Sequence, residues 1–255
     1  MPSDLERIQI YLRGQARRGR GAQALAAFTV YTPATDGAAD LPYAIPRRPT
    51  RTVRDADLDE VHAIFERQSA RPKVEFLADL YPDLPERLAS AGYQETRRQS
   101  VLLARPHDIQ ALPAPAHSGV IVLSQASSLE EIRETLDTNA LGFDEPAGAS
   151  EGQAEAFRAG LVSSRAFTLR AEGRPVAAGM FESITGGVTE LLGIATLPEY
   201  RRRGFAAYLT AAMAQSAFAH GATLVFLCAA SEEAGRVYQR TGFRPCATLV
   251  EYSRE

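Results

Sequence analysis

The chain has 255 residues, of which 45% are hydrophobic and 23% are charged, and its formal net charge is −3. So small a net charge gives no electrostatic field strong enough to argue for binding to nucleic acid or to an acidic membrane, and nucleic-acid binding through an arginine run is the weaker possibility. No apolar run approaches the roughly 18 residues that a membrane span needs. With two cysteines and no apolar signal core, we expect a cytoplasmic protein with neither a nucleic-acid nor a membrane partner. The length favours two domains, since one domain usually has about 100–200 residues.

The N-terminal half alternates between helix and strand signals. Apolar residues at helical spacing from Leu58 to Phe65 follow an aspartate cap and indicate a helix. In chain order we predict a helix over 4–17, a hairpin of strands 26–31 and 41–45, a helix over 55–69, a strand over 74–77, a helix over 84–91 and a strand over 100–104. The first helix ends among arginines that we interpret as solvated: Arg13, Arg17, Arg18 and Arg20.

A proline-rich segment follows, and prolines stiffen the chain around them. It predicts a domain over 1–105, a linker over 106–118 and a second domain over 119–255. The second half reads as a strand over 119–123, a helix opening at Ser128, a helix over 151–163, a hairpin of 167–170 and 175–182, a strand over 188–196, a helix over 205–220, a strand over 223–228, a helix over 232–241 and a strand over 247–252. This order predicts a mixed α/β sheet with flanking helices.

The start of the helix over 205–220 carries a chemical signal. Most helices begin with a side chain that accepts a hydrogen bond from the first turn. Here the segment Arg201–Ala207 offers three arginines and Gly204, and no acceptor. Such a start suits an anion, most simply a phosphate, although three arginines before a helix are also common in a solvated turn.

Three linked motifs resemble the GNAT superfamily of N-acetyltransferases over residues 119–255. Arg201-x-x-Gly204-x-Ala206 is similar to the family's pyrophosphate loop. The strand ahead of it, Leu192-Gly193-Ile194-Ala195-Thr196, with Pro198 and Tyr200, is similar to the family's apolar strand and turn. Ala234-x-x-x-Tyr238-x-x-x-Gly242-Phe243 resembles the helix and turn that close the cofactor site.

The resemblance implies an acetyl-coenzyme A site. The backbone of Ile194, Ala195 and Thr196 would bind the pantetheine arm as an additional strand. Ser231 stands where the family often has asparagine, which puts its expected cofactor contact in doubt. The pyrophosphate would lie against Arg201, Arg202, Arg203, Gly204, Phe205, Ala206 and Ala207.

The resemblance also implies direct transfer of acetyl to an amine in a ternary complex. Glu190 would be the general base and Tyr238 the acid that protonates the departing thiolate. Tyr238 could instead be an ordinary aromatic of an apolar helix face, although the surrounding motif favours the acid role. Glu190 could equally be a solvent-facing side chain. The alternative function is a non-catalytic acetyl-coenzyme A sensor or assembly module. We predict no metal, because the four histidines lack ligand spacing, and Cys228 reads as a core residue.

The acceptor amine has no readable signature. The acceptor can be a small-molecule amine or a peptide amine, and the sequence does not say whether the protein is a homodimer. Acidic residues around 136–163 would attract a cationic amine or form a solvated face: Asp137, Asp144, Glu145 and Glu151.

The N-terminal half repeats the order of the last elements. Leu84-x-x-x-Leu88-x-x-x-Gly92-Tyr93 parallels the motif around Tyr238, with Leu88 in the tyrosine's place. The segment 46–54, where the phosphate loop would be, has two prolines and no glycine. We therefore predict tandem GNAT-like mixed sheets with a degenerate first copy that shapes the substrate cleft or an interface. A chance match of two strand–helix–strand units is the alternative.

Overall fold

The computed structural model describes residues 2–33, 42–47 and 52–254. Residue 41 of the predicted strand and residues 48–51 of the segment 46–54 therefore lie outside the described residues. The chain divides into two compact units. The N-terminal unit comprises Met1–Val101 with Cys246–Glu255, and the C-terminal unit comprises Leu102–Pro245.

The N-terminal unit is a mixed sheet with the strand order β1-β2-β3-β4-β11-β5. Strands β1 to β3 form an antiparallel meander, β3 and β4 are parallel, and β4 and β11 are antiparallel. Its elements are α1 (Asp4–Ala16), β1 (Arg20–Ala24), β2 (Phe28–Pro33), β3 (Tyr43–Pro46), α2 (Asp55–Arg67), β4 (Lys73–Leu77), η1 (Ala78–Leu80), α3 (Leu84–Ser90), β5 (Gln94–Ala104) and β11 (Arg244–Ser253).

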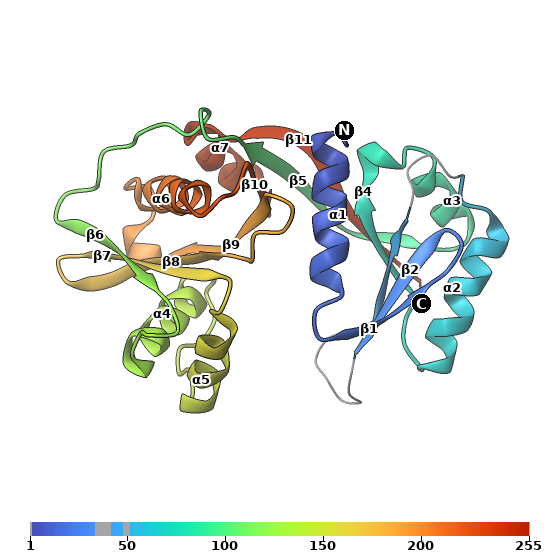
Figure 1. Ribbon diagram of the computed structural model, residues 1–255, viewed down its shortest axis with the longest axis horizontal. Coiled ribbons are helices and arrows are strands. Elements are labelled where there is room, and N and C mark those ends of the chain that lie inside the picture. Colours follow the sequence, from blue (N-terminus) through green and yellow to red (C-terminus); the bar gives the residue numbers. More distant parts are fainter. Residues whose placement is uncertain (1, 34–41, 48–51, 255) are drawn as a thin grey trace. The chain divides into compact units, whose positions relative to one another are not determined.

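Helices cover both faces of this sheet. Ala44 of β3 packs in the core of α2 and α3, whereas the next residue, Ile45, packs with Ala16 of α1. Because successive strand residues point to opposite faces, α1 lies on the face opposite to α2 and α3. The arrangement of these helices around β2 and β4 can be followed in Figure 1.

The C-terminal unit has the strand order β5-β10-β9-β8-β7-β6. Strands β6 to β9 are antiparallel neighbours, and β9 and β10 are parallel. Its further elements are β6 (Ser118–Leu123), α4 (Leu129–Gly142), α5 (Glu151–Gly160), β7 (Arg165–Ala171), β8 (Arg174–Phe181), β9 (Val188–Thr196), η2 (Pro198–Tyr200), α6 (Phe205–Ala219), β10 (Leu224–Ala229) and α7 (Glu232–Arg240).

This sheet is also covered on both faces. Phe167 of β7 packs in the core of α6 and α7, whereas its neighbour Ala166 packs with Ile132 of α4. Figure 1 shows α6 on one side of β8 and β9, with α4 and α5 on the other. The predicted fold, a mixed α/β sheet flanked by helices in each half, is confirmed.

The unit boundaries differ from the predicted domains because the last strand of each half runs into the other unit. Residues 94–101 of β5 belong to the N-terminal unit, and Leu102–Ala104 lie beside β10 in the C-terminal unit. Strand β11 instead leaves the C-terminal unit and pairs with β4, with Val250 opposite Phe76. The domain predicted over 119–255 therefore lacks the strand that flanks β10 and includes one that belongs elsewhere.

The predicted linker 106–118 lies within the C-terminal unit, and the turn at its start is docked. The Asp108 carboxylate accepts hydrogen bonds from the Arg105 N–H at 2.9 Å and the Arg244 guanidinium at 3.0 Å. A Cβ on Gly242, whose φ is +107°, would lie 2.0 Å from the Asp108 carbonyl oxygen. Only glycine fits there, so this end of the segment is held against the turn after α7.

The predicted repeat is confirmed in the backbone. Helices α3 and α7 each end in a glycine with positive φ, followed by a buried aromatic residue whose N–H donates to a carbonyl five residues back. The equivalent groups are Gly92 at +83° and Gly242 at +107°, the bond from Tyr93 N–H to Leu88 oxygen at 2.9 Å, and that from Phe243 N–H to Tyr238 oxygen at 3.2 Å.

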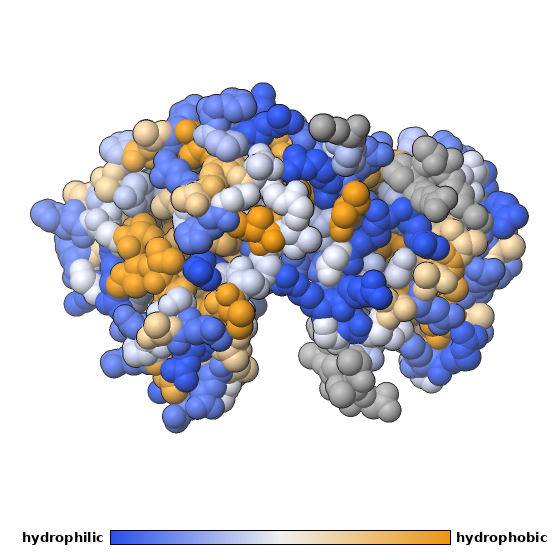
Figure 2. Space-filling model, viewed as in Figure 1, coloured by the Kyte–Doolittle hydropathy of each residue, from blue (hydrophilic) through white to orange (hydrophobic). Residues whose placement is uncertain are grey.

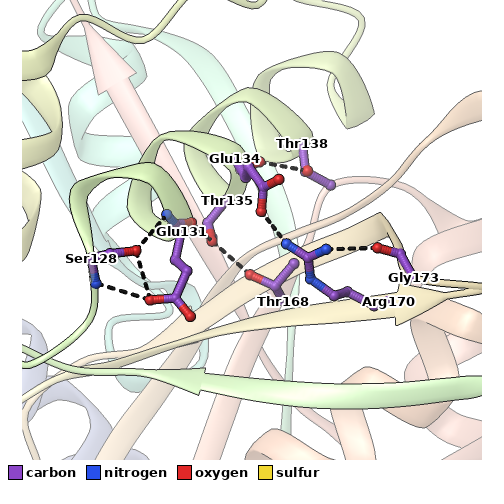
Figure 3. Close-up of polar contacts among 8 residues, drawn as sticks. All are labelled: Ser128, Glu131, Glu134, Thr135, Thr138, Thr168, Arg170 and Gly173. Atoms are coloured by element: carbon purple, nitrogen blue, oxygen red, sulfur yellow. Dashed lines mark hydrogen bonds and ion pairs between the residues drawn. The ribbon is translucent and has the colours of Figure 1, made fainter.

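Polar contacts fix α4 on the sheet (Figure 3). The hydroxyls of Thr135 and Thr168 hydrogen bond at 2.6 Å, and Glu134 pairs with Arg170 of β7. A capping box between Ser128 and Glu131 begins the helix. These contacts hold α4 on β7, and its last turn reaches β9, where the candidate site lies.

No helix among the described residues is long and apolar enough to cross a membrane.

Candidate cofactor and active site

Strands β9 and β10 pair over only part of their length. The parallel register runs from Val188 opposite Leu224 to Glu190 opposite Phe226 and ends there. Strand β9 continues to Thr196, still paired with β8 on its other side. Between residues 191–196 of β9 and 227–229 of β10 the sheet therefore has a fork. Backbone groups along a strand edge without a partner strand can accept one more extended segment.

A β-bulge produces this fork. Ala195 faces Ala178 and Leu192 faces Met180, so β9 has one residue more than β8 between these pairs. Gly193 supplies the left-handed conformation at the bulge, with φ +62°. A bulge bends its strand and increases the local twist, which turns the end of β9 away from β10.

The bulge is held from α4 by a residue that sequence reasoning missed. The Asn139 side-chain amide donates to the Gly193 carbonyl oxygen at 2.5 Å. One helical turn further on, a Cβ on Gly142 would lie 2.7 Å from Cβ of Ala195. Only a glycine allows α4 to approach β9 this closely. An asparagine and a glycine three residues apart on one helix face were the available signal, but the contact depends on the tertiary fold.

Arg201, predicted to bind phosphate, has partners within the chain. Its guanidinium donates to the carbonyl oxygens of Thr196 at 3.2 Å and Gly142 at 2.9 Å, and lies 3.3 Å from the Asp144 carboxylate. These bonds tie the end of α4 to the end of β9. In this structure Arg201 therefore orients the rim of the fork.

Helix α6 begins beside the end of β9 without a cap of its own. Gly204 is the N-cap residue with φ +85°, no side chain caps the helix and its first turn has no acid. The first helical bond runs from the Tyr208 N–H to the Gly204 oxygen. The N–H groups of Phe205, Ala206 and Ala207 find no acceptor among the described residues. These donors, together with the positive end of the helix dipole, form a place for an anion.

The other two arginines differ in their surroundings. Arg203 stacks on the rings of Tyr200 and Phe205 at 5.2 and 5.4 Å from their centroids. Arg202 is exposed, adopts a positive φ of +60°, and its side chain pairs with none of the described residues. The cation available to a bound anion is therefore Arg202. A Cβ on Gly204 would meet no atom within 4 Å, so the helix start is open on that side.

Tyr238 lies in the core of the C-terminal unit and is 9% exposed. Burial raises the pKa of its hydroxyl to about 12, and Cys228 on β10 adds to this shift. The hydroxyl therefore keeps its proton at neutral pH. Tyr238 is therefore a core aromatic whose phenol is protonated at neutral pH, and its role as the acid stays a prediction.

Glu190 is half-buried at the last paired position of β9, where the fork opens. Ser231 is the N-cap of α7, and its hydroxyl oxygen accepts from the Ala234 N–H at 3.2 Å. Because the oxygen already accepts this bond, the predicted contact with the cofactor would use the Ser231 hydroxyl as a hydrogen-bond donor. Of the acids near α4, Asp137 accepts from the Gly148 and Ala149 N–H groups, each at 2.8 Å.

Comparisons with known proteins agree with this geometry. Residues 129–243 match the model of the acetyltransferase (GNAT) family. The chain is similar to a GCN5-related N-acetyltransferase from Kribbella flavida, with 26% identity, a TM-score of 0.82, and coverage of 100% of this chain and 96% of that one. A tandem GNAT protein from the clavulanic acid biosynthesis pathway shares the fold at 15% identity, with a TM-score of 0.66 and coverage of 100% and 88%. No curated protein matches the sequence significantly.

Proposed function

We propose that the C-terminal unit transfers an acetyl group from acetyl-coenzyme A to an amine, because residues 129–243 match the model of the acetyltransferase (GNAT) family and the whole chain is similar in fold to GNAT proteins, a tandem one among them. The observation that carries the proposal is the fork between β9 and β10 lying next to the uncapped start of α6. An extended arm with a pyrophosphate fits these two features together.

The residues present fit this cofactor. The backbone of Ile194–Thr196 lines the fork and would hold the pantetheine arm as an added strand. The N–H groups of Phe205, Ala206 and Ala207 would hold the pyrophosphate, with Arg202 neutralising its charge. Acetyl-coenzyme A, when bound, supplies an activated acetyl thioester.

The chain's own residues would move two protons. The Glu190 carboxylate accepts a proton from the substrate ammonium, which makes the amine nucleophilic. Tyr238 holds a proton at Oη for the departing thiolate, and its raised pKa of about 12 keeps that proton in place at neutral pH. The second proton, which the nitrogen loses as the amide forms, balances the one that Tyr238 gives. The amine attacks the thioester directly, because neither cysteine is placed to act as a nucleophile. Burial raises the pKa of Cys246 to about 12, so it stays a thiol, and Cys228 is part of strand β10.

The acceptor is an amine attached to an apolar group. Leu141 and Phe143, on either side of Gly142, are 43% and 50% exposed. Two of the nearby acids are engaged, Asp137 with backbone N–H groups and Asp144 with Arg201. This favours an aryl or alkyl amine over a polycation. Figure 2 shows further hydrophobic surface on this unit, over β6 and β7.

An activity assay tests the proposal. Release of the coenzyme A thiol is followed with acetyl-coenzyme A and a panel of arylalkyl amines, peptides and polyamines. We expect turnover with arylalkyl amines, and loss of turnover in Gly204→Glu, which places a carboxylate at the anion site. The matched control is Gly221→Glu at the other end of α6, where φ is +99° and a Cβ also meets no atom within 4 Å.

Equal activity in Gly204→Glu and Gly221→Glu would show that the start of α6 does not bind the cofactor. Binding of acetyl-coenzyme A without turnover on any amine would instead favour a non-catalytic binding module.

A further inference from the structure

The N-terminal unit contains the counterparts of both halves of the candidate site. Strands β3 and β4 are parallel neighbours like β9 and β10, with Ala44 opposite Val74 as the paired position among the described residues. Helix α2 follows β3 as α6 follows β9. Both units therefore contain a parallel strand pair with a helix between its two strands, and the surroundings of these elements can be compared group by group.

At β4, a side chain from α1 satisfies the strand. Gln9 is 1% exposed, and its Oε1 accepts a hydrogen bond from the N–H of Leu77, the last residue of β4, at 3.2 Å. A glutamine buried this fully is costly unless it is hydrogen bonded. On α4 of the C-terminal unit, Asn139 instead binds the bulge of β9.

The end of β3 is satisfied in the same way. The Pro46 carbonyl oxygen accepts from the Tyr81 hydroxyl at 3.1 Å and from the Arg13 guanidinium at 3.4 Å. Arg13 also donates to the Arg47 carbonyl oxygen. Helix α1 thus hydrogen bonds to the ends of both strands. Its residue Gln9 binds the end of β4, and its residue Arg13 binds the end of β3.

The start of α2 has a carboxylate where α6 has none. Asp57 is 2% exposed and accepts from the Arg54 N–H at 2.8 Å and from the Arg54 guanidinium at 3.3 Å. Asp55 adds a second acid to this first turn. Negative side chains here complement the helix dipole and repel a phosphate.

We propose that helix α1 and Asp57 occupy the N-terminal unit's counterpart of the cofactor site, so that the protein binds one acetyl-coenzyme A per chain. This inference rests on the proposed function of the C-terminal unit. Gln9 replaces a hydrogen bond of a pantetheine arm at β4, and the Asp57 carboxylate at the start of α2 stands where the pyrophosphate would bind. Arg13 bonds to the end of β3 as Arg201 bonds to the end of β9. The N-terminal unit also has no proton donor at the position equivalent to Tyr238, where it has the fully buried Leu88.

Titration calorimetry with acetyl-coenzyme A on the full-length protein tests this inference. We expect one equivalent bound by wild type and none by Gly204→Glu, because only the C-terminal unit has an open site. Two equivalents in wild type, or one retained in Gly204→Glu, would overturn the inference and leave an active C-terminal site standing. No binding by wild type would overturn the proposed function and this inference with it.

A second variant tests the role of α1. Gln9→Met keeps the length of the side chain but removes the acceptor for the Leu77 N–H. We expect faster hydrogen exchange at the Leu77 amide and a lower melting temperature, with one equivalent of acetyl-coenzyme A still bound. The matched control is Gln15→Met, at the end of the same helix. An unchanged exchange rate at Leu77 in Gln9→Met would overturn the assignment of α1 as the occupant of this site.

Discussion

The two units of this protein share an element order and differ in how they satisfy the same backbone groups. In the N-terminal unit, Gln9, Arg13 and Asp57 bind the ends of β3 and β4 and the start of α2. In the C-terminal unit the Arg201 guanidinium bonds to the end of β9 at the Thr196 carbonyl oxygen, whereas the start of α6 has neither a side-chain cap nor an acid in its first turn. The two units therefore differ at the helix start, which has acids in α2 and none in α6, and at the bond from Gln9 to β4.

Buried polar groups need partners, which makes this difference informative. In a unit that has lost its ligand, buried backbone groups without partners would destabilise the fold. Loss of the ligand therefore requires hydrogen bonds from within the chain to replace it. The bonds of Gln9 and Asp57 are such replacements. The comparison yields four predictions, ordered from the largest expected effect to the smallest.

Removal of residues 1–105 has the largest expected effect. It deletes Leu102–Ala104, which flank β10, and the strand β4 that pairs with β11. Because Leu102 and Ala104 are fully buried with Tyr238 in one core, we expect the remaining 106–255 to lose its cooperative melting transition by circular dichroism. As a control, an inserted protease site at 112–114 is cut while both pieces are kept, and the transition should survive. A folded 106–255 fragment that binds acetyl-coenzyme A would contradict the strand assignment.

Tyr238→Phe should lower kcat by about a hundredfold, at the lower end of the range for general acid catalysis, while acetyl-coenzyme A binding is retained. Burial raises the pKa of Tyr238 to about 12, so the protonated form is lost only as the pH rises through that value. The wild-type rate should therefore show no Tyr238-dependent fall between pH 7 and 10. Phe218→Leu, remote on α6, is the control variant. Unchanged kcat in Tyr238→Phe would remove this residue as the acid.

Asn139→Leu should raise the KM for acetyl-coenzyme A several-fold with a smaller change in kcat. It leaves the Gly193 carbonyl without its partner, at a cost of about 1–3 kcal/mol for a buried acceptor, and loosens the bulge that opens the fork. The control is Thr138→Val, whose hydroxyl bonds only to its own helix at Glu134. Equal KM values in the two variants would mean that the bulge holds without Asn139.

Arg202→Gln should have the smallest effect. An exposed charge pair contributes about 0–1 kcal/mol, so the Kd for acetyl-coenzyme A should rise by no more than about fivefold, and its dependence on salt should weaken. Exposed Arg174 on β8 provides the control variant, Arg174→Gln. A loss of binding as complete as that in Gly204→Glu would show that Arg202 contributes far more than an exposed cation.

The sequence predicts local features well. The helices, the repeat at Gly92 and Gly242, and the uncapped start of α6 all follow from short-range patterns. Strand β1 was missed, because Arg20 and its neighbouring glycines resemble a solvated turn. The exchange of β5 and β11 was also missed, since the alternating apolar pattern of a strand does not specify which strand lies beside it.

The candidate site divides in the same way. The motif around Gly204 marks the anion site without tertiary information. Arg201 was predicted to bind phosphate, but its hydrogen bonds to Thr196 and Gly142 join residues far apart in sequence. Asn139 and Gln9 belong to helices whose own pattern predicts only an apolar face. Their bonds to strands depend on how each helix packs, which no short sequence pattern encodes.

The most direct test of the difference between the units is hydrogen exchange of the full-length protein with and without saturating acetyl-coenzyme A. We predict slower exchange of amides in 194–196 and 204–207, and unchanged exchange in 43–47 and 54–57. Protection of the segments in the N-terminal unit, or of neither unit, would contradict the conclusion that only the C-terminal unit keeps an open cofactor site.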